Sequence, residues 1–158
     1  MCIRDRYFNL KINNQNYRIY VEEAGSGIPL ICLHTAGSDG RQFRHILNDK
    51  KITNKYRIIV FDLPWHGKSN PPEGYEDLDY KLTTDFYKQI IMSFCNKYEL
   101  INPVIMGCSM GGRVVLHLAL EQNEYFRAVI ALEGSDKLEP YYELEWVCRP
   151  DAVSYTHL

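Results

Sequence analysis

Four short apolar runs, each ending in a polar loop, constrain the fold of this chain more than any other feature of its sequence. They cover residues 29–34, 56–62, 103–106 and 126–132. Runs of this length with few polar positions are typical of strands that are buried on both faces of a sheet. Amphipathic stretches separate the runs. One of them places Phe86, Tyr87, Ile90, Ile91 and Phe94 on a single helical stripe. Buried strands alternating with helices predict βαβ units and a mostly parallel sheet.

The N-terminal part of the chain has a different pattern. Residues 7–12 and 17–22 alternate apolar and polar side chains, and two asparagines lie between them, which predicts a β-hairpin. The expected fold is therefore one three-layer α/β/α domain over residues 7–152, with about six strands and an antiparallel N-terminal hairpin at one edge. Residues 1–6 and 153–158 resemble translated sequencing-adaptor sequence, and we expect both to be non-native tails.

Composition excludes several classes of protein. The 158 residues carry a formal net charge of −2 with scattered Lys and Arg, which gives no reason to expect a nucleic-acid partner. No apolar run approaches the roughly 18 residues of a membrane span, and no signal-peptide pattern appears. The five cysteines have no metal-ligand spacing and are odd in number, which favours reduced thiols in a cytoplasmic protein without a metal site.

The motif with the clearest chemistry is Gly107-Cys108-Ser109-Met110-Gly111, followed by Gly112. It joins a buried strand to a helix predicted over residues 110–120. A serine in this context sits on a sharp, strained turn that raises its hydroxyl above the carboxyl end of the sheet. The Met110 N–H and the helix N-terminus then point at an oxyanion formed beside the serine. We interpret Ser109 as a nucleophile; the alternative is a purely structural glycine-rich turn.

Two further loops follow neighbouring strands. His34-Thr35-Ala36-Gly37 can offer a second N–H to the oxyanion, from Ala36, with His34 stabilising the loop by hydrogen bonding. Its structural alternative is a plain strand-to-helix connection. The second loop, residues 62–69, contains His66, which we expect to be structural rather than a catalytic base. His45 is expected on the surface, and His117 lies too far along its helix to reach Ser109.

Together these residues resemble the α/β-hydrolase superfamily over about residues 17–150. Three motifs occur in the family's order: His34-Thr35-Ala36-Gly37, where Thr35 replaces the commoner glycine; Asp62-Leu63-Pro64-Trp65-His66-Gly67-Lys68-Ser69; and the serine turn of residues 107–112. The resemblance implies an eight-stranded sheet, of which this chain supplies about six strands. It also implies a triad of serine, acid and histidine in that order, with no metal or organic cofactor.

The resemblance places the acid and the histidine after strands that this sequence lacks. His157 follows Ser109 by only 48 positions (157 − 109), too early for the family's histidine. Glu133 is a candidate for the acid in a variant arrangement. Residues 135–152 would begin the lid that family members insert, which largely sets substrate choice.

The resemblance implies a serine hydrolase that acts on a small-molecule carboxylic ester, thioester or lactone through an acyl-enzyme, with carbon–carbon bond hydrolysis as a variant. This chain alone is expected to be catalytically inactive. The alternative is a non-catalytic receptor or scaffold that kept the serine turn. The sequence does not indicate an oligomeric state.

Overall fold

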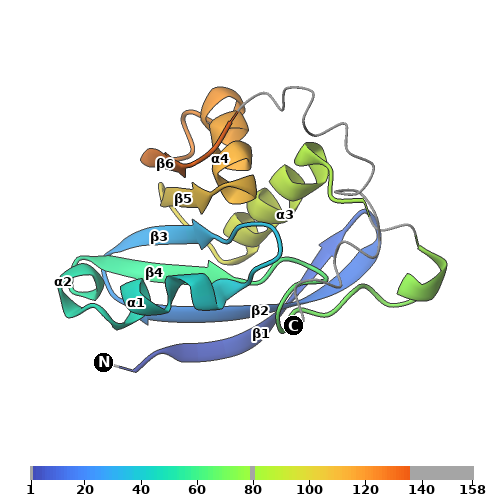
Figure 1. Cartoon of the computed structure of the whole chain (residues 1–158), viewed down its shortest axis with the longest axis horizontal. Helices are drawn as coiled ribbons and strands as arrows, with labels where there is room; N and C mark the ends of the chain where they lie inside the picture. Colours follow the sequence, from blue (N-terminus) through green and yellow to red (C-terminus); the bar gives the residue numbers. More distant parts are fainter. Residues whose placement is uncertain (1, 79–80, 136–158) are drawn as a thin grey trace.

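The computed structural model describes residues 2–78 and 81–135, in which strands and helices alternate after an N-terminal hairpin (Figure 1). The elements are β1 (Arg4–Ile12), β2 (Gln15–Gly25), β3 (Ile28–Leu33), the 3₁₀ turn η1 (Gly40–Phe43), α1 (Arg44–Asn48), α2 (Lys50–Thr53), β4 (Tyr56–Phe61), the 3₁₀ turn η2 (Tyr75–Asp77), α3 (Thr84–Lys97), β5 (Val104–Cys108), α4 (Met110–Glu121) and β6 (Ala128–Leu132).

The six strands form one sheet in the order β1-β2-β4-β3-β5-β6. Strands β4, β3, β5 and β6 pair in parallel, whereas β1 pairs antiparallel with β2 and β2 pairs antiparallel with β4. This confirms the expected mostly parallel sheet with an antiparallel hairpin at one edge. The β1–β2 turn has left-handed Asn13 (φ 48°) and Asn14 (φ 63°), as a two-residue hairpin turn requires.

Apolar side chains that alternate along the central strands build a separate core on each face of the sheet. Ile31, Ile59 and Ile105 belong to the core that α3 and α4 cover. The neighbouring residues Leu30 and Ile58 belong to the core that η1 and α1 cover through Phe43 and Leu47. Because successive side chains of a strand point to opposite faces, buried strands of this kind produce three layers.

Helix α3 shows how local sequence sets the ends of an element. The Thr83 hydroxyl accepts a hydrogen bond from the Phe86 N–H at 3.1 Å and caps the first turn, while Lys97 lies in the last turn. Both features suit the helix dipole and its unpaired terminal groups. The stripe that the sequence predicts is buried except for Phe86, which is partly exposed.

Three regions differ from the expectations. Strand β1 begins at Arg4, three residues earlier than expected, and the Arg6 side chain donates to the hydroxyl of Tyr98, the residue that follows α3. Residues 4–6 therefore take part in the fold, whatever their origin. The sequence did not predict the short helices α1 and α2 or the turn η1, because none of them is long enough to show a helical periodicity. Of the expected lid, residues 136–152 lie outside the described part of the chain.

Candidate active site

The carboxyl ends of β3 and β5 are neighbours, which brings together two of the three motifs. The strands pair in parallel with Leu33 opposite Gly107. The loop that begins at His34 and the turn that contains Ser109 therefore leave the sheet at the same edge, side by side. Strand β4 pairs with the other side of β3, so the loop that begins at Asp62 joins them. Parallel sheets place their binding sites at this edge.

Ser109 occupies a strained turn between β5 and α4. Its backbone has φ 52° and ψ −109°, a conformation that a residue with a side chain rarely adopts. The side chain is exposed and makes no capping hydrogen bond to α4. The Ser109 N–H donates to the Leu132 carbonyl at 2.8 Å, so β6 holds the turn in place. Among residues 2–78 and 81–135, no hydrogen bond engages the Ser109 hydroxyl.

Glycines are needed around this turn because backbone lies against backbone. A Cβ on Gly107 would lie 2.2 Å from the Gly111 carbonyl oxygen, and a Cβ on Gly111 would lie 2.6 Å from the Leu33 carbonyl oxygen. A second contact joins Gly112 of α4 to Gly134, just past β6. A Cβ on Gly112 would lie 3.0 Å from the Gly134 Cα, and a Cβ on Gly134 would lie 2.6 Å from the Gly112 carbonyl carbon. No side chain fits at these positions without moving the backbone.

Ala36 lies in a tight turn that presents it to solvent. The Ser38 N–H donates to the Thr35 carbonyl at 3.3 Å, and Gly37 takes a positive φ of 68°, the pattern of a turn with glycine in its third position. Ala36 is exposed, and among the described residues no acceptor lies within hydrogen-bonding distance of its N–H. The Met110 N–H is the first of α4, so it has no hydrogen-bond acceptor within the helix.

His34 is fully buried beneath this turn. Its Nε2 accepts from the Leu63 N–H at 3.1 Å, and its Nδ1 lies 2.8 Å from the Thr35 carbonyl oxygen. Since a backbone N–H can only donate, Nε2 carries no proton, and Nδ1–H donates to Thr35. Burial lowers the pKa of His34 from 6.5 to about 4, so the ring is neutral at pH 7. These contacts join His34 to its own loop and to the loop after β4.

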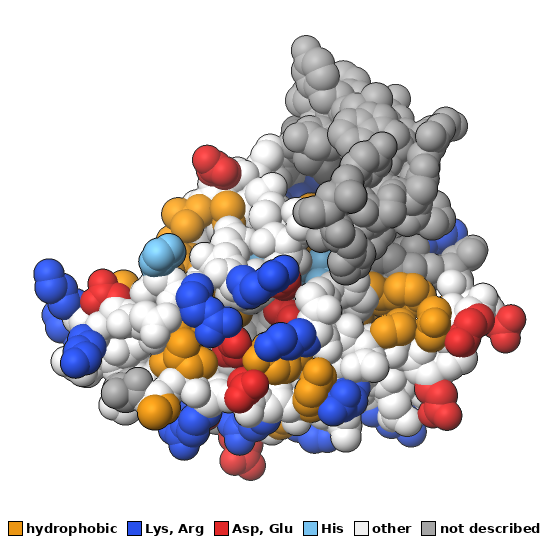
Figure 2. Space-filling view, turned by 60° about the horizontal axis from the view of Figure 1, so that its bottom comes forward, with side chains coloured by type: hydrophobic (Ala, Val, Ile, Leu, Met, Phe, Trp, Pro, Cys, Tyr) orange, Lys and Arg blue, Asp and Glu red, His pale blue; other side chains and the backbone are white. Residues whose placement is uncertain are grey.

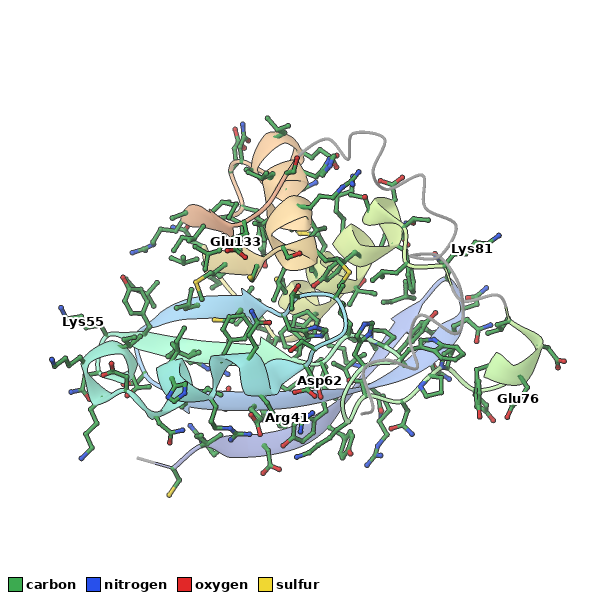
Figure 3. All side chains as sticks on the ribbon, viewed as in Figure 1. Arg41, Lys55, Asp62, Glu76, Lys81 and Glu133 are labelled. Carbon is green, nitrogen blue, oxygen red and sulfur yellow. The ribbon has the colours of Figure 1, made fainter. Side chains whose placement is uncertain are left out.

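Asp62 ties two loops together at the end of β4. Its carboxylate accepts from the Gly40 N–H at 2.7 Å and from the Lys68 N–H at 2.8 Å. The Ser69 hydroxyl donates to the Asp62 carbonyl at 2.7 Å and accepts from the Tyr20 N–H at 2.9 Å. Burial raises the pKa of Asp62, against the effect of its two N–H donors. In Figure 3, Asp62 lies beside the β3–α1 connection, whereas Glu133 lies near β5, β6 and α4.

The sequence did not indicate that Asp62 has this linking function. The only signal was the spacing of Asp62, Gly67, Lys68 and Ser69. Gly67 has φ 52°, and a Cβ there would lie 2.3 Å from Asp62 Oδ2. The carboxylate therefore occupies the space that a side chain at position 67 would need.

Other candidate side chains are not brought to Ser109. His66 is part-buried, with its Nδ1 at 3.0 Å from the Pro64 carbonyl oxygen, as expected of a structural residue. His45 is exposed, as expected. The Nε2 of His117 is buried in α4 without a hydrogen-bond partner. Glu133 is exposed with φ 51°, and no hydrogen bond or ion pair joins its side chain to another described residue. His157 lies outside the described residues.

A cleft in the described part of the chain lies beside Gly37 and Ser38, and Ser109 does not line it. Its volume is about 590 Å³, and residues of β2 and of the loops after β3 and β4 line it. Three basic and three acidic side chains contribute: Arg41, Arg44, Lys68, Glu22, Asp39 and Asp62. On the face that Figure 2 shows, basic and acidic side chains are likewise mixed rather than separated.

Residues 2–78 and 81–135 contain neither a metal-ligating cluster nor a membrane-spanning helix. No group of three or more His, Cys, Asp or Glu side chains in this part could hold a metal ion. None of the helices described there has the length and the apolar character that a bilayer crossing demands.

The family follows from comparison with known proteins. A model described as the alpha/beta hydrolase fold matches residues 28–146, well over half of the chain. The chain therefore belongs to the α/β hydrolase fold family. The matched region contains all three motifs.

Individual relatives support the same family. The chain is 31% identical over 103 residues to the AB hydrolase superfamily protein YisY of Bacillus subtilis, covering 65% of this chain and 35% of that protein. It is 32% identical over 117 residues to a pimeloyl-[acyl-carrier protein] methyl ester esterase of Aeromonas salmonicida, covering 74% and 42%. A thermophilic esterase of Thermogutta terrifontis has the same fold, with a TM-score of 0.76 at 18% identity over 89% of this chain and 50% of that structure. The chain thus spans between a third and a half of the length of these relatives.

Proposed function

We propose that this chain carries the nucleophile and the oxyanion donors of a serine hydrolase that acts on carboxylic esters, thioesters or lactones. The observation that carries the proposal is the backbone of Ser109, held at φ 52° and ψ −109° with an exposed side chain. Strain of this kind costs free energy and persists where the surrounding structure enforces it, as at active sites. The surrounding structure here is the set of close glycine contacts and the bond to Leu132.

In the proposed reaction, Ser109 Oγ attacks the carbonyl carbon of the substrate while a histidine removes the hydroxyl proton. The carbonyl oxygen becomes an oxyanion that accepts hydrogen bonds from the Met110 and Ala36 N–H groups. The bond from the carbonyl carbon to the leaving oxygen or sulfur then breaks, and the histidine returns the proton to the leaving group. Water hydrolyses the resulting acyl-enzyme by the same steps and regenerates Ser109.

The histidine and the acid are assigned to sequence beyond this chain. None of the described histidines contacts Ser109, and the relatives are two to three times longer than the matched region. Glu133, next to the bond between Leu132 and Ser109, is the alternative acid. Two of the similar proteins are named esterases, which supports an ester as the first substrate class to test. Buried, unpaired Cys32 and Cys95 support a reducing, cytoplasmic location.

The test uses the protein encoded by the full gene. Fluorophosphonate probes react with activated serines, and we expect labelling that Ser109→Ala abolishes. Ser26→Ala is the matched control, since Ser26 is exposed at the opposite edge of the sheet, between β2 and β3. Turnover is then compared on a p-nitrophenyl ester, an aryl thioester, a lactone and a vinylogous 1,5-diketone. The diketone reports carbon–carbon cleavage. Labelling that persists in Ser109→Ala, or none at all, would contradict the nucleophile and favour a non-catalytic receptor or scaffold.

A further inference from the structure

We infer that His34 is a positioning residue that fixes the plane of the peptide carrying the Ala36 oxyanion donor. The inference rests on the proposed function and assigns the residue that makes one of its two donors available. In a trans peptide, the carbonyl and the following N–H point in opposite directions. The direction of the Ala36 N–H is therefore set by whatever holds the Thr35 carbonyl.

The Thr35 carbonyl is held from the protein side. It accepts from His34 Nδ1–H at 2.8 Å and from the Ser38 N–H at 3.3 Å. His34 has no exposed surface, whereas Ala36 is exposed. With the carbonyl turned inward onto His34, the Ala36 N–H is turned outward, at the edge of the sheet where Ser109 lies.

The neighbouring N–H of the same loop is already used. The Thr35 N–H donates to Gln42 Oε1 at 2.9 Å, so it is not available to an oxyanion. The Ala36 N–H has no acceptor among the described residues. The loop therefore distinguishes two successive N–H groups: one that stabilises the turn and one left for a ligand.

His34 can hold the Thr35 carbonyl only when Nδ1 carries the ring proton. The loop after β4 selects this tautomer. The Leu63 N–H donates to Nε2 at 3.1 Å, which places the ring proton on Nδ1. Leu63 follows Asp62, whose carboxylate is fixed by two N–H groups. A backbone donor 29 positions away from His34 thus selects the tautomer that points the Ala36 N–H outward.

Two isosteric substitutions separate this function from simple loop stabilisation. In His34→Asn the side-chain amide nitrogen can take the place of Nδ1 and donate to Thr35, but nothing reaches Leu63. In His34→Gln the longer side chain can accept from Leu63, but it leaves Thr35 without its donor. We measure kcat and KM of the full-gene protein on a p-nitrophenyl ester. His45→Gln, at an exposed position in α1, is the control.

We expect kcat of His34→Gln to fall by about 10- to 100-fold with KM within about twofold, and His34→Asn to keep kcat within about threefold. Ala36→Pro removes the N–H itself at the second position of the turn, where proline is well accommodated, and should lower kcat by about 100- to 1000-fold. Adding His34→Gln to Ala36→Pro should then have almost no further effect, because both act through the same N–H.

Equal losses of kcat in His34→Asn and His34→Gln, or fully additive effects of His34→Gln and Ala36→Pro, would overturn the inference. Absence of any Ser109-dependent turnover would instead contradict the proposed function. If His34→Gln does not fold, the ¹⁵N shifts of the His34 imidazole in the unsubstituted protein decide. A protonated Nδ1 supports the inference, and a protonated Nε2 overturns it.

Discussion

The loops after β3 and β4 and the loops after β5 and β6 leave one sheet at the same edge, yet they are held in different ways. In the first pair, buried polar side chains bond to backbone groups, as His34, Asp62 and Ser69 show. In the second pair, the polar side chains of Ser109 and Glu133 are exposed, and backbone lies directly against backbone. The first arrangement is sensitive to protonation and to loss of one polar atom. The second is sensitive to any added carbon atom.

The largest expected effect concerns the second pair of loops. Gly107→Ala places a Cβ 2.2 Å from the Gly111 carbonyl oxygen, so the strand or the helix must move. We expect a loss of more than about 4 kcal/mol of stability, measured by urea denaturation. Gly74→Ala is the control: Gly74 has φ 74° but nothing within 4 Å of a Cβ, so only conformational strain of roughly 1 kcal/mol applies. Equal midpoints for the two variants would contradict the close contact at Gly107.

The next effect concerns the first pair of loops and depends on pH. Burial lowers the pKa of His34 to about 4, whereas the unfolded chain takes up the proton near pH 6.5. The unfolded state therefore binds more protons between these values, and stability falls as pH falls from 6.5 to 4, by up to about 3 kcal/mol. Burial also lowers the pKa of His66, which contributes to the same fall in stability as the pH falls.

Denaturation at pH 7 and pH 4.5 isolates the contribution of His34. His34→Gln cannot take up a proton, so its loss of stability between the two pH values should be smaller than that of the unsubstituted protein. His45→Gln should behave like the unsubstituted protein. An unchanged pH dependence in His34→Gln would show that the His34 ring titrates normally in the folded state.

A smaller change in stability, this time a gain, is expected for a substitution at Ser109. The conformation at φ 52° and ψ −109° is the mirror image of an extended one, and glycine adopts both equally well. Ser109→Gly should therefore raise stability by about 1 to 2 kcal/mol while abolishing fluorophosphonate labelling, whereas Ser109→Ala abolishes labelling and keeps the strain. A Ser109→Gly variant less stable than Ser109→Ala would show that the turn is not strained.

The smallest effect is expected at the outer edge of the sheet. Ile130 of β6 is 40% exposed, whereas Ile105 of the neighbouring β5 is fully buried. In the 158-residue chain, Ile130→Lys should change stability by less than about 0.5 kcal/mol and increase solubility, since charge on an edge strand opposes association. Ile105→Ala should cost about 2 to 5 kcal/mol. A large loss in Ile130→Lys, measured by the same denaturation, would mean that β6 is covered in solution.

The two halves of the carboxyl edge also differ in how far the sequence predicts them. The serine turn was predictable because its motif lies within six consecutive residues, and the strand, the helix and the strained conformation all follow locally. The β3 loop was predictable as a donor loop, but not the link from His34 to Leu63 or from Asp62 to Gly40. These bonds join residues 29 and 22 positions apart, and no local pattern encodes them.

The sequence predicted local backbone conformation at some positions but not at those where tertiary contacts of the side chain accompany it. Asn13 and Asn14 were correctly predicted as a hairpin turn, since asparagine tolerates a positive φ. Trp65 takes φ 67°, and nothing in its sequence context indicates a left-handed tryptophan. Its ring packs edge-on against Tyr75 at 5.2 Å between centroids, so tertiary contact rather than local preference accompanies this conformation. The assignments of Ser109, Met110, Ala36 and Glu133 to chemical functions stay predictions.

The contact between Gly112 and Gly134 has a consequence for the evolution and engineering of this chain. Each position excludes a side chain because of the backbone of the other, so neither can be relieved by a smaller neighbour. A library that randomises both positions and selects for folded protein should return glycine at both, with no compensating pairs. Contact between two backbones, without any contribution from side chains, thereby fixes the path of the chain out of β6 as far as Gly134.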